Sequence, residues 1–292
     1  MNDAQITTAA LIATYSPKNQ VLKLAEVLVS TGIPVMVSDD ASPCTADLVL
    51  NQLRSMAGVE VIRHSRNEGI ARGLNEGLTW AQNQGAQWLV TFDQDSIVDA
   101  DYIAEITTFA QSRESLWNST IRIGAVGAGH VRDESDELHY PITVVASAGA
   151  EISCTEEVIQ SGTLWSVAAM TLVRGFDERL GIDAVDAAAC LRLREQGYRI
   201  ALAPDLELQH RLGEARAIKV FGKTVLATGH SGKRRATMIR NRLRLAPAEF
   251  RQSPKHAFRT LRRVSVNAVL GATVEGDRWE KFKGSLRGLR KT

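Results

Sequence analysis

The chain has 292 residues, of which 44% are apolar and 23% are charged. It is long enough for one large domain with a small appendage, and its composition is that of a globular protein rather than a disordered one. The three cysteines are scattered and form no Cys-x-x-Cys pair. This pattern argues against a structural zinc site and a disulfide framework, and it fits a reducing compartment.

The formal net charge of +2 conceals an uneven distribution of charge along the chain. Residues 233–292 contain 17 basic and 4 acidic side chains, whereas residues 1–232 contain 18 basic and 29 acidic ones. Such a basic tail predicts contact with an anionic membrane surface, a phosphorylated lipid or a nucleic acid, although a solvated helical face explains the charge equally well. Nucleic acid is the weakest candidate, because only 5% of residues are aromatic and no recognition motif is present.

The N-terminal residues have neither the basic region nor the long apolar region of a signal peptide. No uninterrupted apolar stretch reaches the roughly 18 residues of a transmembrane helix. We therefore expect the protein to remain in the cytoplasm.

Short apolar runs alternate with helical patterns in the first hundred residues. Strands are predicted at residues 6–14, 34–37, 59–63 and 88–92, and helices at residues 18–30, after residue 43, and at residues 69–83. Strands that alternate with helices in this way are typical of βαβ units. The pattern predicts an α/β fold with a mainly parallel sheet that helices cover on both faces.

The pattern is looser after residue 120. Strands are predicted at residues 121–129, 142–150 and 198–203, an interrupted apolar stretch at 158–169, and a helix at 183–196 that ends at Gly197. From residue 231 the sequence is typical of basic helices, with breaks at Pro247 and Pro254. We predict a domain of residues 1–230 that carries the site, followed by a basic helical region of residues 231–292.

Polar residues follow three of the predicted strands. Thr14 and Tyr15 come after the first strand, Asp39 and Asp40 after the second, and Asp93-Gln94-Asp95 after the fourth. Ligands of parallel sheets bind beyond the carboxyl ends of the strands, so these residues are expected to converge on one crevice.

Asp93 and Asp95 are the clearest candidates for chemistry. Two carboxylates one residue apart on a turn can face one hard divalent cation such as Mg²⁺ or Mn²⁺. A solvated turn is the alternative interpretation, but the position at the predicted ligand edge favours the metal.

Two further groups at this edge suit a nucleotide. The carboxylate of Asp39 can accept a hydrogen bond from the imide N–H of a pyrimidine, although a helix N-cap explains it equally well. Gly69, Gly73 and Gly77 recur every four residues and predict close approach of a helix to the sheet or to a ligand. Arg72, near the start of that helix, can meet a diphosphate.

Taken together, the order and spacing of these motifs resemble glycosyltransferase family 2, the inverting GT-A enzymes. Later motifs are similar to the bacterial rhamnosyltransferase branch of that family. The resemblance covers residues 10–290 and is carried by Ala13-Thr14-Tyr15, Asp39-Asp40-Ala41-Ser42, Asn67-x-Gly69, Asn75-x-Gly77, Asp93-Gln94-Asp95-Ser96, Ser161-Gly162, Gly175-Phe176-Asp177-Glu178, Asp183-x-x-Asp186, Cys190-Leu191-Arg192, Gly197-Tyr198, His210-x-Leu212-Gly213, Arg240-Asn241 and Phe282-Lys283-Gly284.

The resemblance implies a GT-A (Rossmann-like) mixed sheet and a role for each matching residue. Thr14, Tyr15, Asp39, Arg72, Asp93 and Gln94 would bind the nucleotide sugar. Asp93, Asp95 and His210 would hold Mg²⁺ or Mn²⁺, Asp186 would be the catalytic base, and Ser161, Gly162, Asp183, Arg234 and Arg240 would meet the acceptor or the diphosphate.

The resemblance also implies the reaction and its setting. The expected activity is transfer of L-rhamnose from dTDP-rhamnose to a lipid-linked precursor of a cell-surface polysaccharide such as an O-antigen, at the inner face of the cell membrane. The basic helices would bind that anionic surface as a peripheral anchor or form a homo-oligomer.

One departure from the branch is the run Ala187-Ala188-Ala189, where an acidic and an aromatic residue usually follow the base. A neighbouring carboxylate that could bind the acceptor is therefore missing, which either an enlarged acceptor pocket or an impaired or altered enzyme would explain. The run thus leaves open a non-catalytic scaffold that binds nucleotide sugars. A separate alternative concerns the donor, because the sequence does not reveal the shape of the sugar pocket: a transferase of a UDP- or dTDP-linked hexose or of galactofuranose.

Overall fold

The computed structural model describes residues 7–117, 121–132, 137–147, 150–210, 216–220, 223–227, 230–273 and 276–290. The chain forms two compact units, Met1–His210 and Arg211–Thr292. The predicted boundary, at residue 230, lies later in the sequence. The difference arises because the hairpin of β11 (Arg216–Val220) and β12 (Lys223–Ala227) belongs to the second unit, where β12 packs against helix α8 (Pro254–Thr273).

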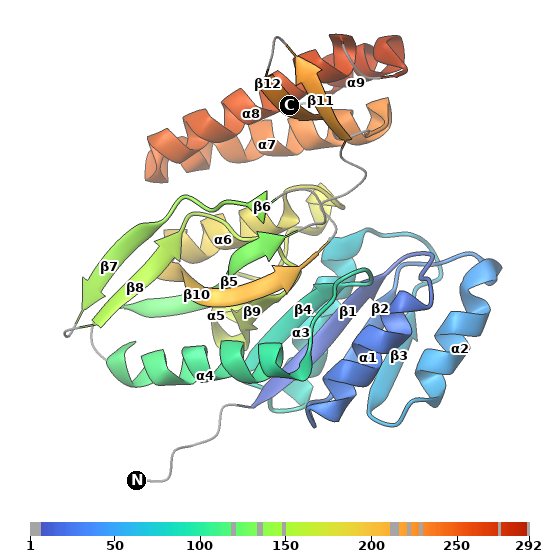
Figure 1. Cartoon of the computed structure of the whole chain (residues 1–292), viewed down its shortest axis with the longest axis vertical. Coiled ribbons are helices and arrows are strands. Elements are labelled where there is room, and N and C mark those ends of the chain that lie inside the picture. Colours follow the sequence, from blue (N-terminus) through green and yellow to red (C-terminus); the bar gives the residue numbers. More distant parts are fainter. Residues whose placement is uncertain are drawn as a thin grey trace. The chain divides into compact units, whose positions relative to one another are not determined.

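In the described residues, the first unit is built on a ten-stranded mixed sheet (Figure 1). The strand order is β3-β2-β1-β4-β9-β5-β10-β8-β7, and β6 pairs with β5. The strands are β1 (Thr8–Thr14), β2 (Val35–Asp39), β3 (Val59–Arg63), β4 (Trp88–Asp93), β5 (Arg122–Arg132), β6 (Glu137–Leu138), β7 (Thr143–Ser147), β8 (Ala150–Thr155), β9 (Thr163–Ser166) and β10 (Tyr198–Gln209).

The mixed sheet agrees with the predicted fold class, but its parallel part is smaller than the sequence indicated. Among the described strands, parallel pairing is confined to β3-β2-β1-β4 and to β5-β10. β7 and β8 are joined by too short a connection for a parallel crossover, so they pair antiparallel, as does β9 with both of its neighbours.

Helices cover both faces of the sheet. Those of the first unit are α1 (Gln20–Ser30), α2 (Asp47–Ser55), α3 (Ile70–Asn83), α4 (Ala100–Trp117), α5 (Val167–Leu172) and α6 (Val185–Glu195), with 3₁₀ turns η1 (Cys44–Ala46) and η2 (Glu178–Leu180). Helix α1 packs against α2 and α4, whereas α5 packs against α3 and α6. Figure 1 shows these two groups on opposite faces of the sheet. The sequence did not predict α4, because its apolar residues form no clear stripe.

Glycines bring α3 close to the sheet. A Cβ at Gly73 would lie 2.6 Å from Oγ of Ser38, and one at Gly77 would lie 2.5 Å from Cδ2 of Leu11. The predicted close approach is confirmed at these two positions. Gly69 differs, because it precedes the helix with φ of +89°.

The second unit contains the basic helices α7 (Gly232–Gln252), α8 and α9 (Arg278–Arg290), and α7 packs against both others. The break predicted at Pro254 is confirmed, since α8 begins there. The break predicted at Pro247 is wrong, because α7 continues through that residue. Its packing against two helices compensates for the backbone hydrogen bond that proline cannot donate. Within the described ranges, no helix has the length and apolar character needed to cross a membrane.

Candidate functional site

The carboxyl ends of β1, β2 and β4 meet at one edge of the sheet. The strand register pairs Thr14 with Asp39, and Ala13 with Asp93. The predicted convergence of polar residues at this edge is therefore confirmed, and the residues lie where parallel sheets bind their ligands.

Asp93, Asp95 and His210 form a cluster at this edge. Nε2 of His210 lies 3.5 Å from Oδ2 of Asp93, and its Nδ1 lies 3.9 Å from Oδ1 of Asp95. One potential ligand atom from each residue lies within 4.8 Å of the other two. His210 follows β10, and the backbone N–H of Ile97 donates to the carbonyl of Gln209 over 3.0 Å, which joins the two segments that carry the cluster. The structure thus brings together all three predicted metal ligands.

The donor atoms of the cluster fit a divalent cation. Two carboxylates and one imidazole combine hard oxygen with borderline nitrogen, a set that suits Mn²⁺ better than Mg²⁺, which prefers oxygen alone. The side chains of Asp93 and Asp95 are 33% and 40% exposed, so an ion and a phosphate can reach them. Beside them, Oε1 of Gln160 is buried and has no hydrogen-bond partner among the described residues.

Buried serine hydroxyls contact the cluster from the interior of the protein. Oγ of Ser161 accepts a hydrogen bond of 3.2 Å from the backbone N–H of Asp93 and lies 2.5 Å from Oγ of Ser96. Ser96 in turn lies 3.3 Å from Nδ1 of His210, and the amide of Gln160 donates to Oδ1 of Asp93. Ser161 is only 2% exposed and contacts the cluster from the interior, so its contact with the acceptor or diphosphate stays a prediction.

Gly162, also predicted to lie near the acceptor or diphosphate, is a turn residue in the structure. Its φ is +72°, and a Cβ there would lie 2.6 Å from Oη of Tyr102. Its carbonyl accepts a hydrogen bond of 2.6 Å from that hydroxyl, and its N–H donates to the carbonyl of Thr91 over 2.7 Å. Burial raises the pKa of Tyr102 far above its usual range, so the hydroxyl remains a donor.

Gln94 joins the ends of two neighbouring strands. Its Oε1 accepts a hydrogen bond of 2.9 Å from the backbone N–H of Tyr15, and its Nε2 donates to the Tyr15 carbonyl over 3.1 Å. The Tyr15 residue is 53% exposed, so its ring is available to a ligand. Gln94 therefore positions Tyr15, one of the residues predicted to bind the nucleotide sugar.

Asp39 is enclosed by the protein and is 0% exposed. Its Oδ1 accepts a hydrogen bond of 3.1 Å from Thr14, and its Oδ2 accepts one of 3.0 Å from the backbone N–H of Ser42. Arg63 adds an ion pair, with Nε 3.4 Å from Oδ2. These partners order the turn after β2, and the predicted contact between Asp39 and a base stays a prediction.

The neighbouring Asp40 belongs to a charged cluster that the sequence did not predict. His64 lies between two carboxylates, with Nδ1 3.2 Å from Oδ1 of Asp40 and Nε2 2.7 Å from Oε2 of Glu76. Both ring nitrogens face acceptors, so only the doubly protonated ring can donate to both. Burial lowers the pKa of His64, but the hydrogen bonds with Glu76 and Asp40 outweigh it and raise the pKa above its ordinary value.

This cluster fixes the start of α3. Asp40 accepts hydrogen bonds from the backbone N–H groups of Glu68 and Gly69, at 2.7 and 2.9 Å. On the next turn, Nε of Arg72 donates to Oε1 of Glu76 over 3.0 Å, and the Arg72 side chain is 45% exposed. Arg72 is therefore oriented by a carboxylate yet open to an anion, as a diphosphate contact requires.

The segment before α6 is tied to α3. Asn75 accepts a hydrogen bond of 2.7 Å from the N–H of Phe176 and donates to its carbonyl over 3.0 Å and to Glu178 over 2.7 Å. A Cβ at Gly69 would lie 2.7 Å from the carbonyl oxygen of Gly181, so these two backbones are in direct contact. Motif residues about a hundred positions apart thus position one another.

Asp186 lies in the first turn of α6, and its Oδ1 accepts a hydrogen bond of 2.8 Å from the backbone N–H of Ala187. It is half-buried, as is Asp183 in the preceding turn. The helix N-terminus favours a negative charge at this position. Burial is the main cause that raises the pKa of Cys190 to about 12, and the charge of Asp186 adds to it.

The alanine run after Asp186 is buried. Ala187, Ala188 and Ala189 are 2%, 2% and 0% exposed. These residues therefore pack into the core and do not line an enlarged acceptor pocket.

Arg234 and Arg240, the basic residues predicted to meet the acceptor, both lie on α7 of the second unit. Arg234 is exposed and Arg240 is half-buried, with its Nε 3.4 Å from Oδ1 of Asn241. Arg235, between them, is only 4% exposed and donates to the carbonyl of Asn267 over 2.6 Å, so it joins α7 to α8. The role of Arg234 and Arg240 stays a prediction.

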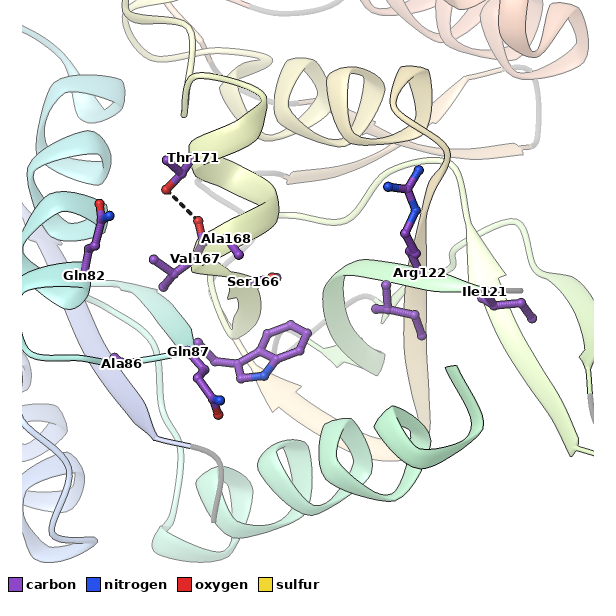
Figure 2. A pocket seen from close by; sticks show the side chains of 11 residues that line it. Gln82, Ala86, Gln87, Ile121, Arg122, Ser166, Val167, Ala168 and Thr171 are labelled. Atoms are coloured by element: carbon purple, nitrogen blue, oxygen red, sulfur yellow. Dashed lines mark hydrogen bonds between the residues drawn. The ribbon is translucent and has the colours of Figure 1, made fainter. Parts of the chain in front are cut away.

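A cavity of about 730 Å³ lies at the opposite edge of the sheet. Figure 2 shows residues of its lining, which include Trp88 at the amino end of β4, Arg122 at the start of β5 and Ser166 at the end of β9. Neither Asp93 nor Asp95 lines it. The candidate active site is therefore the carboxyl edge, not this cavity.

Comparison with known proteins agrees with this site. Residues 11–133, which include Asp93 and Asp95, match the family model described as glycosyl transferase family 2. The chain is also 30% identical over 244 residues to the dTDP-rhamnosyl transferase RfbF of Shigella flexneri, covering 80% of this chain and 77% of that protein. The chain belongs to glycosyltransferase family 2. It is accordingly an enzyme. The segment with Asp93 and Asp95 and the segment with His210 meet at the carboxyl edge of its sheet.

Solved structures show that this glycosyltransferase has the GT-A-like fold. Residues 1–349 of S. aureus TarS, in complex with UDP-GlcNAc, match with a TM-score of 0.60 and 14% identity, over 96% of this chain and 80% of that one. The chain spans 43% of the longer TarS chain. The mannosyltransferase PcManGT of Pyrobaculum calidifontis, in complex with GDP-Man and Mn²⁺, matches with a TM-score of 0.53 and 14% identity, over 99% of this chain and 82% of that one.

Proposed function

We propose that this glycosyltransferase transfers L-rhamnose from dTDP-rhamnose to a hydroxyl of a cell-surface polysaccharide precursor, with inversion at the anomeric carbon. The single observation that carries the proposal is the cluster of Asp93, Asp95 and His210 at the ligand edge of a chain 30% identical to a dTDP-rhamnosyl transferase. The precursor is proposed to be lipid-linked, and the enzyme to act in the cytoplasm at the inner face of the membrane.

A divalent ion, with Mn²⁺ favoured over Mg²⁺ by the imidazole ligand, would be held by Asp93, Asp95 and His210. When bound, such an ion stabilises the negative charge of the departing diphosphate. Arg72, exposed and oriented by Glu76, would add a second positive charge to the same diphosphate. Tyr15, positioned by Gln94, would contact the nucleoside.

Asp186 would act as the base. It would take the proton of the acceptor hydroxyl as that oxygen forms a bond to the anomeric carbon and the bond from that carbon to the diphosphate breaks. The products are the extended glycan, dTDP and the protonated Asp186 carboxyl. Attack opposite the leaving group inverts the anomeric centre. The hydrogen bond from Ala187 to Oδ1 would fix the orientation of the carboxylate.

A donor screen tests the proposal. dTDP-rhamnose, UDP-glucose, UDP-galactose, UDP-galactofuranose and UDP-N-acetylglucosamine are each supplied with Mn²⁺ or Mg²⁺, and release of nucleoside diphosphate is measured. We expect turnover of dTDP-rhamnose alone, with loss in Asp95→Ala and Asp186→Asn. Turnover of another donor would reassign the sugar, and tight donor binding without turnover of any donor would support the scaffold alternative.

A further inference from the structure

Helix α9 exposes its large apolar side chains. The residues that it buries are Lys281 and the small residues Gly284, Ser285 and Gly288, whereas Trp279 is 65% and Phe282 is 40% exposed. Leu286 and Leu289 are also exposed, at 39% and 55%. A helix of a globular protein normally places its large apolar side chains against the core. The arrangement in α9 is the reverse.

The buried face explains how α9 is held without its large side chains. A Cβ at Gly288 would lie 2.8 Å from the carbonyl oxygen of Ala236 on α7, and a Cβ at Gly284 would overlap the backbone of Gly232. The two helix backbones therefore pack directly through glycines. Because this contact already attaches α9 to α7, the attachment does not depend on the exposed aromatic and leucine side chains of the helix.

The exposed apolar residues form one stripe. Trp279, Phe282, Leu286 and Leu289 follow steps of three, four and three residues, which places them on one side of the helix. The rings of Trp279 and Phe282 are stacked, with centroids 5.7 Å apart. We refer to these four side chains as the α9 stripe.

Basic residues accompany the α9 stripe. Residues 278–290 contain five basic side chains, of which Lys281 is buried, and one acidic side chain, Glu280. Nζ of Lys283 lies 5.2 Å from the ring centroid of Trp279 and 3.0 Å from Oε1 of Glu280. Arg287 and Arg290 lie on the same helix turns as Leu286 and Leu289. The stripe is therefore an apolar surface bordered by positive charge.

We propose that the α9 stripe inserts into the interfacial region of an anionic lipid bilayer. Charge complementarity favours a bilayer over a second copy of this chain as the partner. Two copies joined through α9 would bring like charges together, whereas anionic headgroups neutralise the basic side chains. Tryptophan is favoured at the boundary between headgroups and acyl chains, and lysine and arginine extend towards the headgroups from an inserted helix. This inference deepens the membrane part of the proposed function and rests on it for its biological setting.

Vesicle binding by the full-length chain tests the proposal without any sugar donor, so its outcome is independent of the activity assay. Vesicles of phosphatidylcholine with phosphatidylglycerol are compared with vesicles of phosphatidylcholine alone. We expect binding to the anionic vesicles only, weaker at high salt, and at least about tenfold weaker for the double variant Trp279→Ser/Phe282→Ser. The matched control is Leu48→Ser, which removes an apolar side chain of a residue 72% exposed on α2 and should bind as the wild type does.

Three results would overturn the proposal. The first is equal binding to both kinds of vesicle or to neither, and the second is wild-type binding by the double variant. The third is concentration-dependent self-association in sedimentation velocity, without vesicles, that the double variant abolishes, since this would assign the stripe to a second copy. Circular dichroism of the double variant should match the wild type, because both substituted side chains are exposed.

Discussion

Nε2 of His210 lies 3.5 Å from Oδ2 of Asp93, although more than a hundred residues separate them in the sequence. The contact depends on the parallel pairing of β5 with β10, which brings the end of β10 to the edge where β4 also ends. The imidazole is 11% exposed and its other nitrogen lies near Ser96, so its orientation is fixed before any ligand arrives.

Replacement of His210 by alanine should weaken metal binding. The substitution removes one of three proposed ligands and leaves two carboxylates. We therefore expect the affinity for Mn²⁺ to fall by at least about tenfold and the preference for Mn²⁺ over Mg²⁺ to decrease. Titration of the protein with Mn²⁺, followed by electron paramagnetic resonance, measures both. His139→Ala, at an exposed histidine, is the matched control and should bind Mn²⁺ as the wild type does. Unchanged affinity in His210→Ala would remove the histidine from the metal site.

Ser161→Ala should lower both stability and turnover. The substitution deletes a buried hydroxyl that accepts from the backbone of Asp93 and contacts Ser96, and a lost hydrogen bond of this kind costs about 1–3 kcal/mol of unfolding free energy. Because Asp93 is proposed to hold the metal, kcat should fall more than the KM for the donor rises. Urea unfolding and steady-state kinetics measure the two effects.

The control for that experiment is Ser112→Ala, which removes an exposed hydroxyl that donates to the carbonyl of Phe109 within the same helix. It should change neither the free energy of unfolding nor kcat by a measurable amount. A Ser161→Ala variant that loses stability but keeps the wild-type kcat would show that the hydroxyl supports the fold and not the site.

His64 should make the stability of the fold depend on pH. Its pKa in the folded protein is raised above 6.5, so its contribution is fully present below about pH 6.5 and is lost as the pH rises through the raised value. The free energy of unfolding of the wild type should therefore decrease over this range more than that of His64→Gln. The hydrogen bonds with Asp40 and Glu76 account for the larger decrease in the wild type, since a neutral ring can donate to only one carboxylate.

Urea unfolding at several pH values between 5.5 and 8.5, on the wild type and on His64→Gln, measures this difference. His139→Gln controls for the titration of an exposed histidine. Parallel pH profiles of the wild type and His64→Gln would show that folding does not raise the pKa of this histidine.

Much of the fold and the site followed from local signals in the sequence. The apolar runs before Asp93 and Asp39 predicted strands that end at one edge, and the register confirms it. Residues whose partners come from distant segments could not be found in this way. Gln160 and His64 contact the site through strand pairing and helix packing, which spacing does not reveal. The ion pair of Asp39 with Arg63, on the neighbouring strand, is a further contact of this kind.

Gly69→Ala should disturb the segment that leads to the proposed base. Gly69 has φ of +89° and ψ of 160°, a backbone conformation open essentially only to glycine, and a side chain there costs about 1–3 kcal/mol. Its Cβ would also lie 2.7 Å from the carbonyl oxygen of Gly181, five residues before Asp186. We therefore expect lower stability together with a lower kcat, measured by urea unfolding and donor turnover.

Gly85→Ala is the matched control, because Gly85 also has a positive φ, of +73°, but its Cβ would meet no atom within 4 Å. Both variants carry backbone strain, so both should lose stability. Only the Cβ of Gly69→Ala would clash with the segment that leads to Asp186. A loss of kcat confined to Gly69→Ala therefore assigns the effect to the contact with Gly181. Equal kcat values in the two variants would mean that the start of α3 does not position the base.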